Sequence, residues 1–351
     1  MNHEMHEMIA ESVQRLFGDL VTPTALDAFA GRGSYEGLWQ ACVDAGLDRA
    51  TAHEAYGGIG AKFTETATLL HAVGYHAAPV PLADSLVAHA LLAAAEIEPP
   101  DAGIVVPLGL DAGATRWQQT VTARAANVPW GAVAQWGVAC IETPGGCQVL
   151  LVDLRGAATL RTPRPQMAHE PQADVQLEAA PVAAVAPCAM DASHPLLLGA
   201  LARSAQIVGA LERVLILGVV YANERVQFGK PIAQNQVLQQ MLSAVGGHAA
   251  AARTAVQVAC GTPEPNTFDV AVAKVRAGEA AGVAAATVHQ VHGAIGITAE
   301  HVLHHFTQRL WAWRAEYGSE AQWARRLGEW AIGMGPEALW PAIVDRRAGT
   351  D

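Results

Sequence analysis

The sequence is short of positive charge, of cysteine pairs and of uninterrupted apolar runs. It has 22 Lys and Arg residues against 33 Asp and Glu residues, a net charge of −11 over 351 residues. We therefore expect neither nucleic acid nor a membrane surface to be its main partner. The five cysteines are scattered and form no C-x-x-C pair, which favours reduced thiols in a cytoplasmic protein.

Signals for secretion and for membrane insertion are also missing. The first twenty residues carry acidic side chains in an amphipathic pattern, unlike a signal or transit peptide. No run of about eighteen apolar residues stands clear of glycine, polar breaks and a helix-bundle context, so we expect no membrane span. What the chain does have is 51% hydrophobic and only 16% charged residues, enough for a large core in two or three domains.

The hydrophobic pattern divides the chain into three parts. Residues 1–98 repeat apolar side chains at helical spacing and predict an N-terminal α-helical domain. Residues 99–190 change to short β-type runs separated by Gly, Pro and Asp, which predict a small middle antiparallel β domain with Trp117, Trp130 and Trp136 in its core. Residues 191–351 are again helical and Ala-rich, as expected of a C-terminal helical bundle. The fold class is mainly α with a small β domain.

The stretch from Tyr221 to Gln240 lies between two apolar helices and reads YANERVQFGKPIAQNQVLQQ. Arg225 offers a fork of donors that suits phosphate, and Phe228 offers a face for stacking. On spacing alone, the same residues also fit a helix end with an exposed Arg–Glu pair and a core Phe.

This stretch resembles the acyl-CoA dehydrogenase family, whose flavin-contacting corner reads Y-x-x-x-R-x-Q-F-G-x-P-I-x-x-x-Q. The matching residues are Tyr221, Arg225, Gln227, Phe228, Gly229, Pro231, Ile232 and Gln236. The resemblance implies the three-part fold described above, FAD as cofactor, and α,β-desaturation of an acyl-CoA. In that reaction a Glu removes the α proton while the β hydride passes to the flavin. It also implies that Arg225, Gln227 and Phe228 contact FAD.

A second cluster, TVHQVHGAIGITAEHVLHHF, holds five of the 14 histidines. The spacing H-x-x-H followed by H-x-x-H-H raises the possibility of a metal site, but Glu300 is the only carboxylate within the cluster. We therefore expect no bound metal. The segment resembles the family's Q-x-x-G-G-x-G turn near the flavin pyrophosphate, with Gln290 and Gly293 in the matching positions and Ala294 in place of the second glycine. Small residues there let backbone N–H groups approach a phosphate.

Two expected family features are missing. The family's T-E-P-x-A-G-S-D loop has no counterpart in IVVPLGLDAGATRWQQT, at the start of the β domain. The family's base is a Glu directly before a Gly near the C-terminus, or a Glu early in the first bundle helix. Here Tyr317 precedes Gly318, Glu316 lies one step further back, and the helix position falls near Gly199. Because a base must reach its proton within hydrogen-bond distance, Glu316 is only a weak catalytic candidate.

A chain that keeps the flavin corner but lacks the loop and the base resembles the shorter subunit of heteromeric, steroid-type acyl-CoA dehydrogenases. We expect an oxidoreductase of lipid metabolism, and specifically of steroid degradation, that works with a larger related subunit and passes electrons to an acceptor such as electron-transfer flavoprotein. Two alternatives remain: a self-sufficient homo-oligomer that uses Glu316, and a flavin-free scaffold subunit. The weakly charged stretches 196–220 and 270–288 predict an obligate oligomer.

Overall fold

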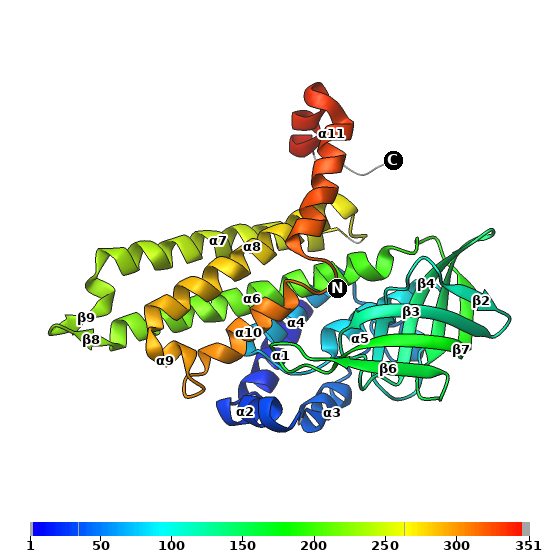
Figure 1. The fold of residues 1–351 in the computed structure, drawn as a ribbon, viewed down its shortest axis with the longest axis horizontal. Helices are drawn as coiled ribbons and strands as arrows, with labels where there is room; N and C mark the ends of the chain where they lie inside the picture. The colour runs from blue at the N-terminus through cyan, green and yellow to red at the C-terminus, as the bar shows by residue number, and fades with distance from the viewer. Residues whose placement is uncertain (1–2, 34, 263, 346–351) are drawn as a thin grey trace.

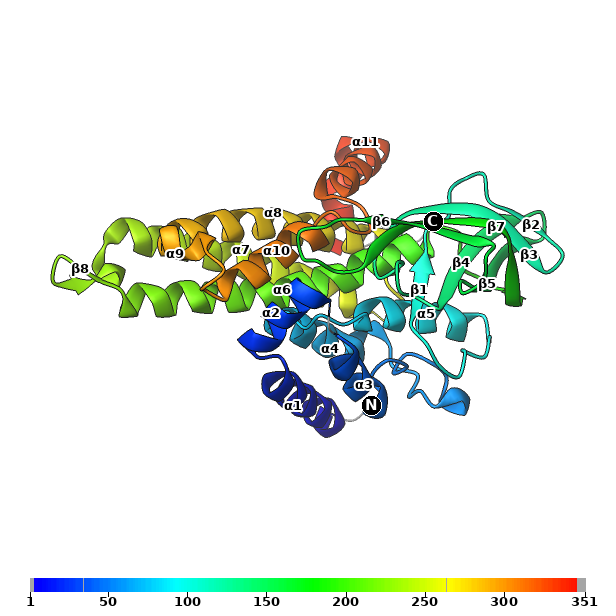
Figure 2. The same cartoon turned by 60° about the horizontal axis from the view of Figure 1, so that its bottom comes forward.

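The computed structural model describes residues 3–33, 35–262 and 264–345. It contains a group of N-terminal helices, a central sheet, and a long C-terminal bundle, as the sequence predicts (Figure 1). The sheet lies at one end of the bundle, and the N-terminal helices cover one flank, which Figure 2 brings forward.

The N-terminal part is built from five α-helices and one short 3₁₀ helix. These are α1 (His3–Leu20), α2 (Pro23–Arg32), α3 (Glu36–Asp44), η1 (Glu54–Tyr56), α4 (Phe63–His76) and α5 (Leu82–Ala94). Thr22 caps α2, because its hydroxyl accepts a hydrogen bond from the Ala25 N–H, and Pro23 follows at the first helical position. The apolar helix α5 is almost wholly buried and packs against strand β1.

The middle part is one seven-stranded sheet. Its strands are β1 (Val105–Leu108), β2 (Thr115–Trp117), β3 (Thr120–Val128), β4 (Trp136–Thr143), β5 (Gly146–Asp153), β6 (Thr159–Arg164) and β7 (Gln172–Pro187). The spatial order is β1-β4-β5-β7-β3-β2, and β6 also pairs with β7. The long strand β7 pairs with β3 and β6 over its first part and with β5 from Val182 onward. This change of partner joins the strands into a single sheet.

Two details of the predicted β domain need correction. The sheet is not antiparallel throughout, because β1 runs parallel to β4. The connection between them includes β2 and β3, and a crossover of this length is what a parallel pair requires. Of the three tryptophans predicted to be core residues, Trp130 is 1% exposed and Trp136 is partly buried, but Trp117 is 77% exposed. Trp117 lies on the short strand β2 at the edge of the sheet, where nothing described covers it.

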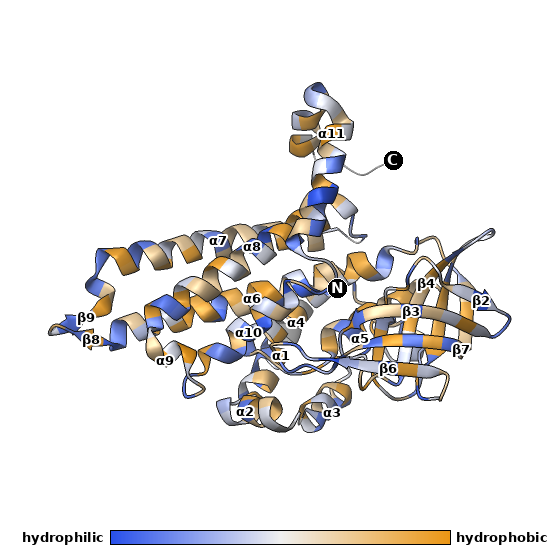
Figure 3. Cartoon of the chain, in the orientation of Figure 1, coloured by the Kyte–Doolittle hydropathy of each residue, from blue (hydrophilic) through white to orange (hydrophobic). Residues whose placement is uncertain are grey.

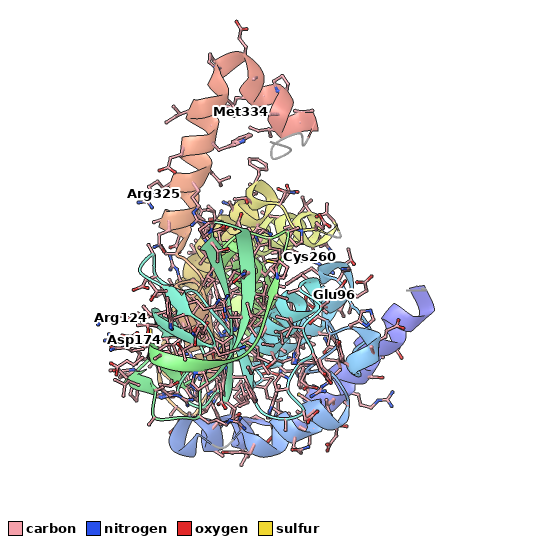
Figure 4. The ribbon with its side chains drawn as sticks, turned by 90° about the vertical axis from the view of Figure 1, so that its right-hand side faces the viewer. Glu96, Arg124, Asp174, Cys260, Arg325 and Met334 are labelled. Carbon is pink, nitrogen blue, oxygen red and sulfur yellow. The ribbon has the colours of Figure 1, made fainter. Side chains whose placement is uncertain are left out.

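The C-terminal bundle is organised around one helix of 31 residues, α6 (His194–Glu224). The other helices are α7 (Gln236–Cys260), α8 (Thr267–His292), α9 (Ala294–Ile297), α10 (Leu303–Trp313) and α11 (Glu320–Asp345). A small hairpin of β8 (Val226–Gln227) and β9 (Lys230–Pro231) and the 3₁₀ helix η2 (Ile232–Gln234) connect α6 to α7. Helix α11 bends at Gly335 and extends away from the body, where Figure 4 labels Arg325 and Met334.

Helix α6 is long and apolar enough to cross a bilayer, judged by length and composition. It is instead the central helix of this fold, and it packs against α4, α7, α8 and α10. Its apolar ribbon is visible inside the bundle in Figure 3. A core helix of a soluble protein passes the same composition test, and this one has 56% of its apolar window buried. The apolar composition of α6 is therefore accounted for by its packing inside the bundle.

Two glycines dock the N-terminal helices onto this central helix. A Cβ added at Gly74 of α4 would lie 1.8 Å from the Gln206 carbonyl oxygen, and one added at Gly209 of α6 would lie 2.0 Å from the His71 carbonyl oxygen. Neither distance is possible for a real side chain, so the two backbones are in direct contact. This close crossing fixes α4 on the bundle and thereby places α5 beside the first half of α6.

Candidate functional site

The predicted flavin corner lies at the C-terminal end of α6. The helix ends at Glu224, and Arg225 donates its backbone N–H to the Tyr221 carbonyl. The chain then makes the β8–β9 hairpin, whose two-residue turn is Phe228-Gly229 with φ values of 52° and 77°. Positive φ at both turn residues matches the right-handed twist of a tight hairpin.

The side chains of this corner face solvent in the single chain. Arg225 and Gln227 are exposed, and Phe228 is 99% exposed at the tip of the hairpin. A phenylalanine in the left-handed region with no contact area has neither favourable backbone geometry nor burial to stabilise it. The geometry therefore presents a cation, an amide and an aromatic face outward.

The second predicted element lies beside the first. Helix α8 ends at His292, and Gly293 has φ 63° and ψ −141°, a conformation that favours glycine although the space around it is open. The His292 ring stacks on the Tyr221 ring, with centroids 4.3 Å apart and an interplanar angle of 19°. This stack brings the exposed residues Gln290 and Gly293 to the same end of the bundle as Arg225.

The weak base candidate Glu316 lies at the other end of α6. It lines a cleft of about 610 Å³ between the sheet and the bundle, together with Pro195 and Leu196 from the first turn of α6. At 1.5 Å per residue, the 31 residues of α6 separate this cleft from the Arg225 corner by roughly 45 Å. The structure therefore does not bring Glu316 together with the predicted flavin residues of the same chain.

Glu316 belongs to a buried ionic cluster that the sequence analysis did not predict. Arg203 donates from Nε to the Glu316 carboxylate at 2.5 Å, and its second terminal nitrogen donates to both Asp84 oxygens at 3.1 and 2.9 Å. The remaining terminal nitrogen donates to the Gln206 side-chain oxygen at 2.6 Å. Tyr317 completes the cluster, because its hydroxyl donates to Asp84 at 2.5 Å.

Burial controls the protonation of this cluster. Removal from water raises the pKa of Glu316 to about 7, even though the Arg203 guanidinium opposes the rise. Burial also raises the pKa of the Tyr317 hydroxyl well above its ordinary value. For Arg203 burial acts to lower the pKa, but the charges of Asp84 and Glu316 reverse this and raise it. The guanidinium is therefore the fixed charge around which the carboxylates are arranged.

The Tyr317 ring lies against Gly199, near which the sequence analysis expects the family's alternative base position. A Cβ added at Gly199 would lie 2.2 Å from the Tyr317 ring, so the ring fills the space that a side chain at position 199 would need. Tyr317 reaches this position through a backbone φ of 52°, and Gly318 follows at 91°. Neither expected base position therefore offers a free acidic side chain. Gly199 has no side chain, and the Glu316 carboxylate is hydrogen-bonded to Arg203.

The sequence carried one usable signal for this cluster. Asp84 is the one Asp, Glu, Lys or Arg residue of α5, and Arg203 is the one such residue of α6 before Glu212, in stretches that are otherwise largely apolar. A charge in such a position is stable only when it is paired, so the two should have been expected to meet.

Comparisons with known proteins agree with this architecture. Residues 3–98 match the acyl-CoA dehydrogenase N-terminal domain family, and residues 191–330 match the acyl-CoA dehydrogenase C-terminal domain family. The chain is 30% identical over 317 residues to acyl-CoA dehydrogenase IpdE2 of Mycobacterium tuberculosis, with 87% of this chain and 91% of the relative covered.

Solved structures show the same fold. The ChsE4–ChsE5 complex from Mycobacterium tuberculosis superposes with a TM-score of 0.86 at 24% identity, covering 96% of this chain and 99% of that one. A Tcur3481–Tcur3483 steroid ACAD variant superposes with a TM-score of 0.83 at 23% identity, covering 93% and 97%. With two family domains matched and a relative aligned along nearly its whole length, the chain belongs to the acyl-CoA dehydrogenase family.

Proposed function

We propose that this chain is one subunit of a heteromeric acyl-CoA dehydrogenase and holds part of an FAD that it shares with a larger related subunit. Members of the family are FAD-dependent flavoproteins, and bound FAD supplies the redox chemistry of the α,β-desaturation. In this proposal Arg225, Gln227, Phe228, Gln290 and Gly293 contact the cofactor, and the partner subunit supplies the catalytic base.

The observation that carries the proposal is the roughly 45 Å between the two ends of α6. The corner at Arg225 faces outward at one end, and the cleft at Glu316 opens at the other. A cofactor that uses the corner must therefore meet its reactive surroundings on another chain.

The corner residues fit the cofactor chemically. Arg225 is an exposed guanidinium with a fork of donors suited to a pyrophosphate, and Phe228 offers a bare aromatic face. The open space around Gly293 lets another group approach the backbone there.

Exposed apolar surface at the same end of the bundle supports an interface there. Exposed apolar side chains gather on the ends of α6 and α7 and on α9: Val219 is 42% exposed, Val220 45%, Val237 60%, Ile295 39% and Ile297 79%. Exposed apolar surface of this kind marks a contact with another chain.

Names of relatives support the partner and substrate by analogy. Two of the similar structures, ChsE4–ChsE5 and Tcur3481–Tcur3483, are named for two different chains, and the second is named as a steroid ACAD. We extend this to an acyl-CoA substrate with a bulky, steroid-type acyl group, to an electron acceptor such as electron-transfer flavoprotein, and to a cytoplasmic location.

One observation favours a second candidate function, a homo-oligomeric enzyme with Glu316 as its own base. Glu316 lines the cleft, its Oε1 has no hydrogen-bond partner in the described part of the chain, and its pKa is raised to about 7. A base poised near neutral pH is suited to proton abstraction. The Arg203 contact to Oε2 argues against it, because that bond stabilises the carboxylate and fixes its position.

Reconstitution distinguishes these functions. The chain is purified alone and together with a co-expressed acyl-CoA dehydrogenase-like partner, and its flavin spectrum, light-scattering mass and acyl-CoA-dependent dye reduction are measured. We expect a colourless or weakly flavinated self-associated chain that becomes yellow and active only with the partner. A yellow, active single-chain oligomer supports the Glu316 enzyme. A complex that never binds flavin supports a scaffold, and a monomer at micromolar concentration contradicts the shared-flavin proposal.

A further inference from the structure

A histidine-rich contact joins the N-terminal helices to the bundle. His304 and His305 lie in the first turn of α10, and Asp27 comes from α2, 278 positions before His305. His305 Nε2 lies 2.9 Å from Asp27 Oδ1. One potential ligand atom from each of the three residues lies within 4.8 Å of the other two.

The His304 imidazole is held in an orientation that suits metal binding. His304 Nδ1 lies 2.8 Å from the His301 carbonyl oxygen, and because a carbonyl only accepts, Nδ1 must carry the proton. This leaves Nε2 of His304 with its lone pair. A histidine ligand is commonly oriented by such a bond from its other nitrogen to a backbone carbonyl.

The contact is buried on the His305 side and open to solvent on the Asp27 side. The His305 side chain is 3% exposed, whereas the Asp27 side chain is 61% exposed. An ion therefore has access from solvent past the carboxylate, and water can complete its coordination. The nearby buried cation Arg309 is offset by Glu170, whose carboxylate lies 3.4 Å from the Arg309 Nε.

The donor set identifies the class of metal. Two imidazole nitrogens and one carboxylate oxygen suit a borderline divalent ion such as Zn²⁺, whereas Ca²⁺ and Mg²⁺ prefer oxygen alone. We propose that Asp27, His304 and His305 bind one Zn²⁺ ion that fastens α2 to α10. This differs from the absence of metal expected from the sequence, which rested on Glu300 being the only carboxylate within the histidine cluster itself.

The proposal predicts a measurable stabilisation. An ion that binds the folded chain and not the unfolded chain lowers the unfolding equilibrium constant about a hundredfold at a free concentration of about a hundred times its Kd. The full-length chain, without an affinity tag and stripped with a chelator, is titrated with zinc chloride by calorimetry, and its thermal unfolding is followed in parallel. We expect one Zn²⁺ per chain and a raised melting temperature.

Matched variants test the ligands. Asp27→Asn and His304→Gln keep side-chain size at positions that are not fully buried, and each should weaken Zn²⁺ binding at least about tenfold. The controls Asp19→Asn and His169→Asn change an exposed carboxylate and an exposed histidine elsewhere and should bind as the unaltered chain does. Near-ultraviolet circular dichroism checks that each variant is folded. Absence of binding, or binding unchanged in both ligand variants, overturns the proposal.

Discussion

Replacing Arg203 with methionine tests the buried ionic cluster on which the assignment of Glu316 depends. Arg203 is 1% exposed, and its guanidinium donates to Asp84, Glu316 and Gln206. Methionine keeps an unbranched chain of similar reach, so the packing loss is small. What remains is a pair of buried carboxylates without their cation.

The expected cost follows from that uncompensated charge. Removing one partner of a buried ion pair typically costs about 3–5 kcal/mol. Asp84 keeps the Tyr317 hydroxyl as a donor, whereas Glu316 loses the donor that the structure gives it. We therefore expect Arg203→Met to lower the free energy of unfolding by about 4 kcal/mol, a large share of the 5–15 kcal/mol typical of a folded protein.

Urea unfolding followed by tryptophan fluorescence measures this loss, since Trp323 is buried and donates to the Tyr317 carbonyl. The control is Arg253→Met: Arg253 is 60% exposed and lies 4.0 Å from Glu212, so its loss should cost about 0.5 kcal/mol or less.

A neutral cluster provides the second arm of the test. Adding Asp84→Asn and Glu316→Gln to Arg203→Met removes the uncompensated charges and should recover at least half of the lost free energy. A loss below about 1 kcal/mol for Arg203→Met alone, with an unchanged urea slope, would refute the reasoning. It would mean that the cluster is hydrated and that Glu316 is not held by a buried cation.

Three further predictions concern the cofactor, the base and pH. Arg225→Ala should lower FAD retention of the assembled complex about ten- to a hundredfold in a dilution assay, because one charged hydrogen bond contributes about 1.5–3 kcal/mol. The control Arg253→Ala should leave FAD retention unchanged. Glu316→Gln should keep turnover of the heteromer within a few fold, since loss of a true base costs about 10²–10⁴ in rate, and a drop of that size favours the self-sufficient enzyme. Burial lowers the pKa of His89 from 6.5 to about 4, so an unfolded chain binds this proton before the folded chain does. The free energy of unfolding should therefore fall by up to about 3 kcal/mol as the pH is lowered from 6.5 to 4. His89→Asn keeps a donor towards the Ser85 carbonyl and should make the urea midpoint less dependent on pH over that range.

Much of the fold followed from local pattern, and the failures have local causes. The helices were readable because apolar residues repeat at helical spacing along most of them. The strand pattern is weakest along β7, because this strand is rich in alanine and contains Pro181, both unusual in strands. In the structure Pro181 lies where β7 passes from β3 to β5, which is a place in a sheet that tolerates the loss of a ladder hydrogen bond.

In the candidate sites, residues that are close together in sequence could be predicted, whereas contacts between distant residues could not. The corner at Arg225 was predicted because its residues are close in sequence, so the motif can be read without knowing the fold. The Arg203 cluster unites α5, α6 and the turn after α10 across separations of 119 and 113 residues, so the sequence indicates that its buried charges need partners but not which residues those partners are. The contact between Asp27 and His305 spans 278 residues. Each of these distant contacts holds one N-terminal helix on the bundle: Asp84 holds α5, and Asp27 holds α2. The residues proposed to bind the cofactor are therefore close together in sequence and exposed. Those that hold the N-terminal helices on the bundle are distant in sequence and mostly buried, and the structure is needed to show which of them pair.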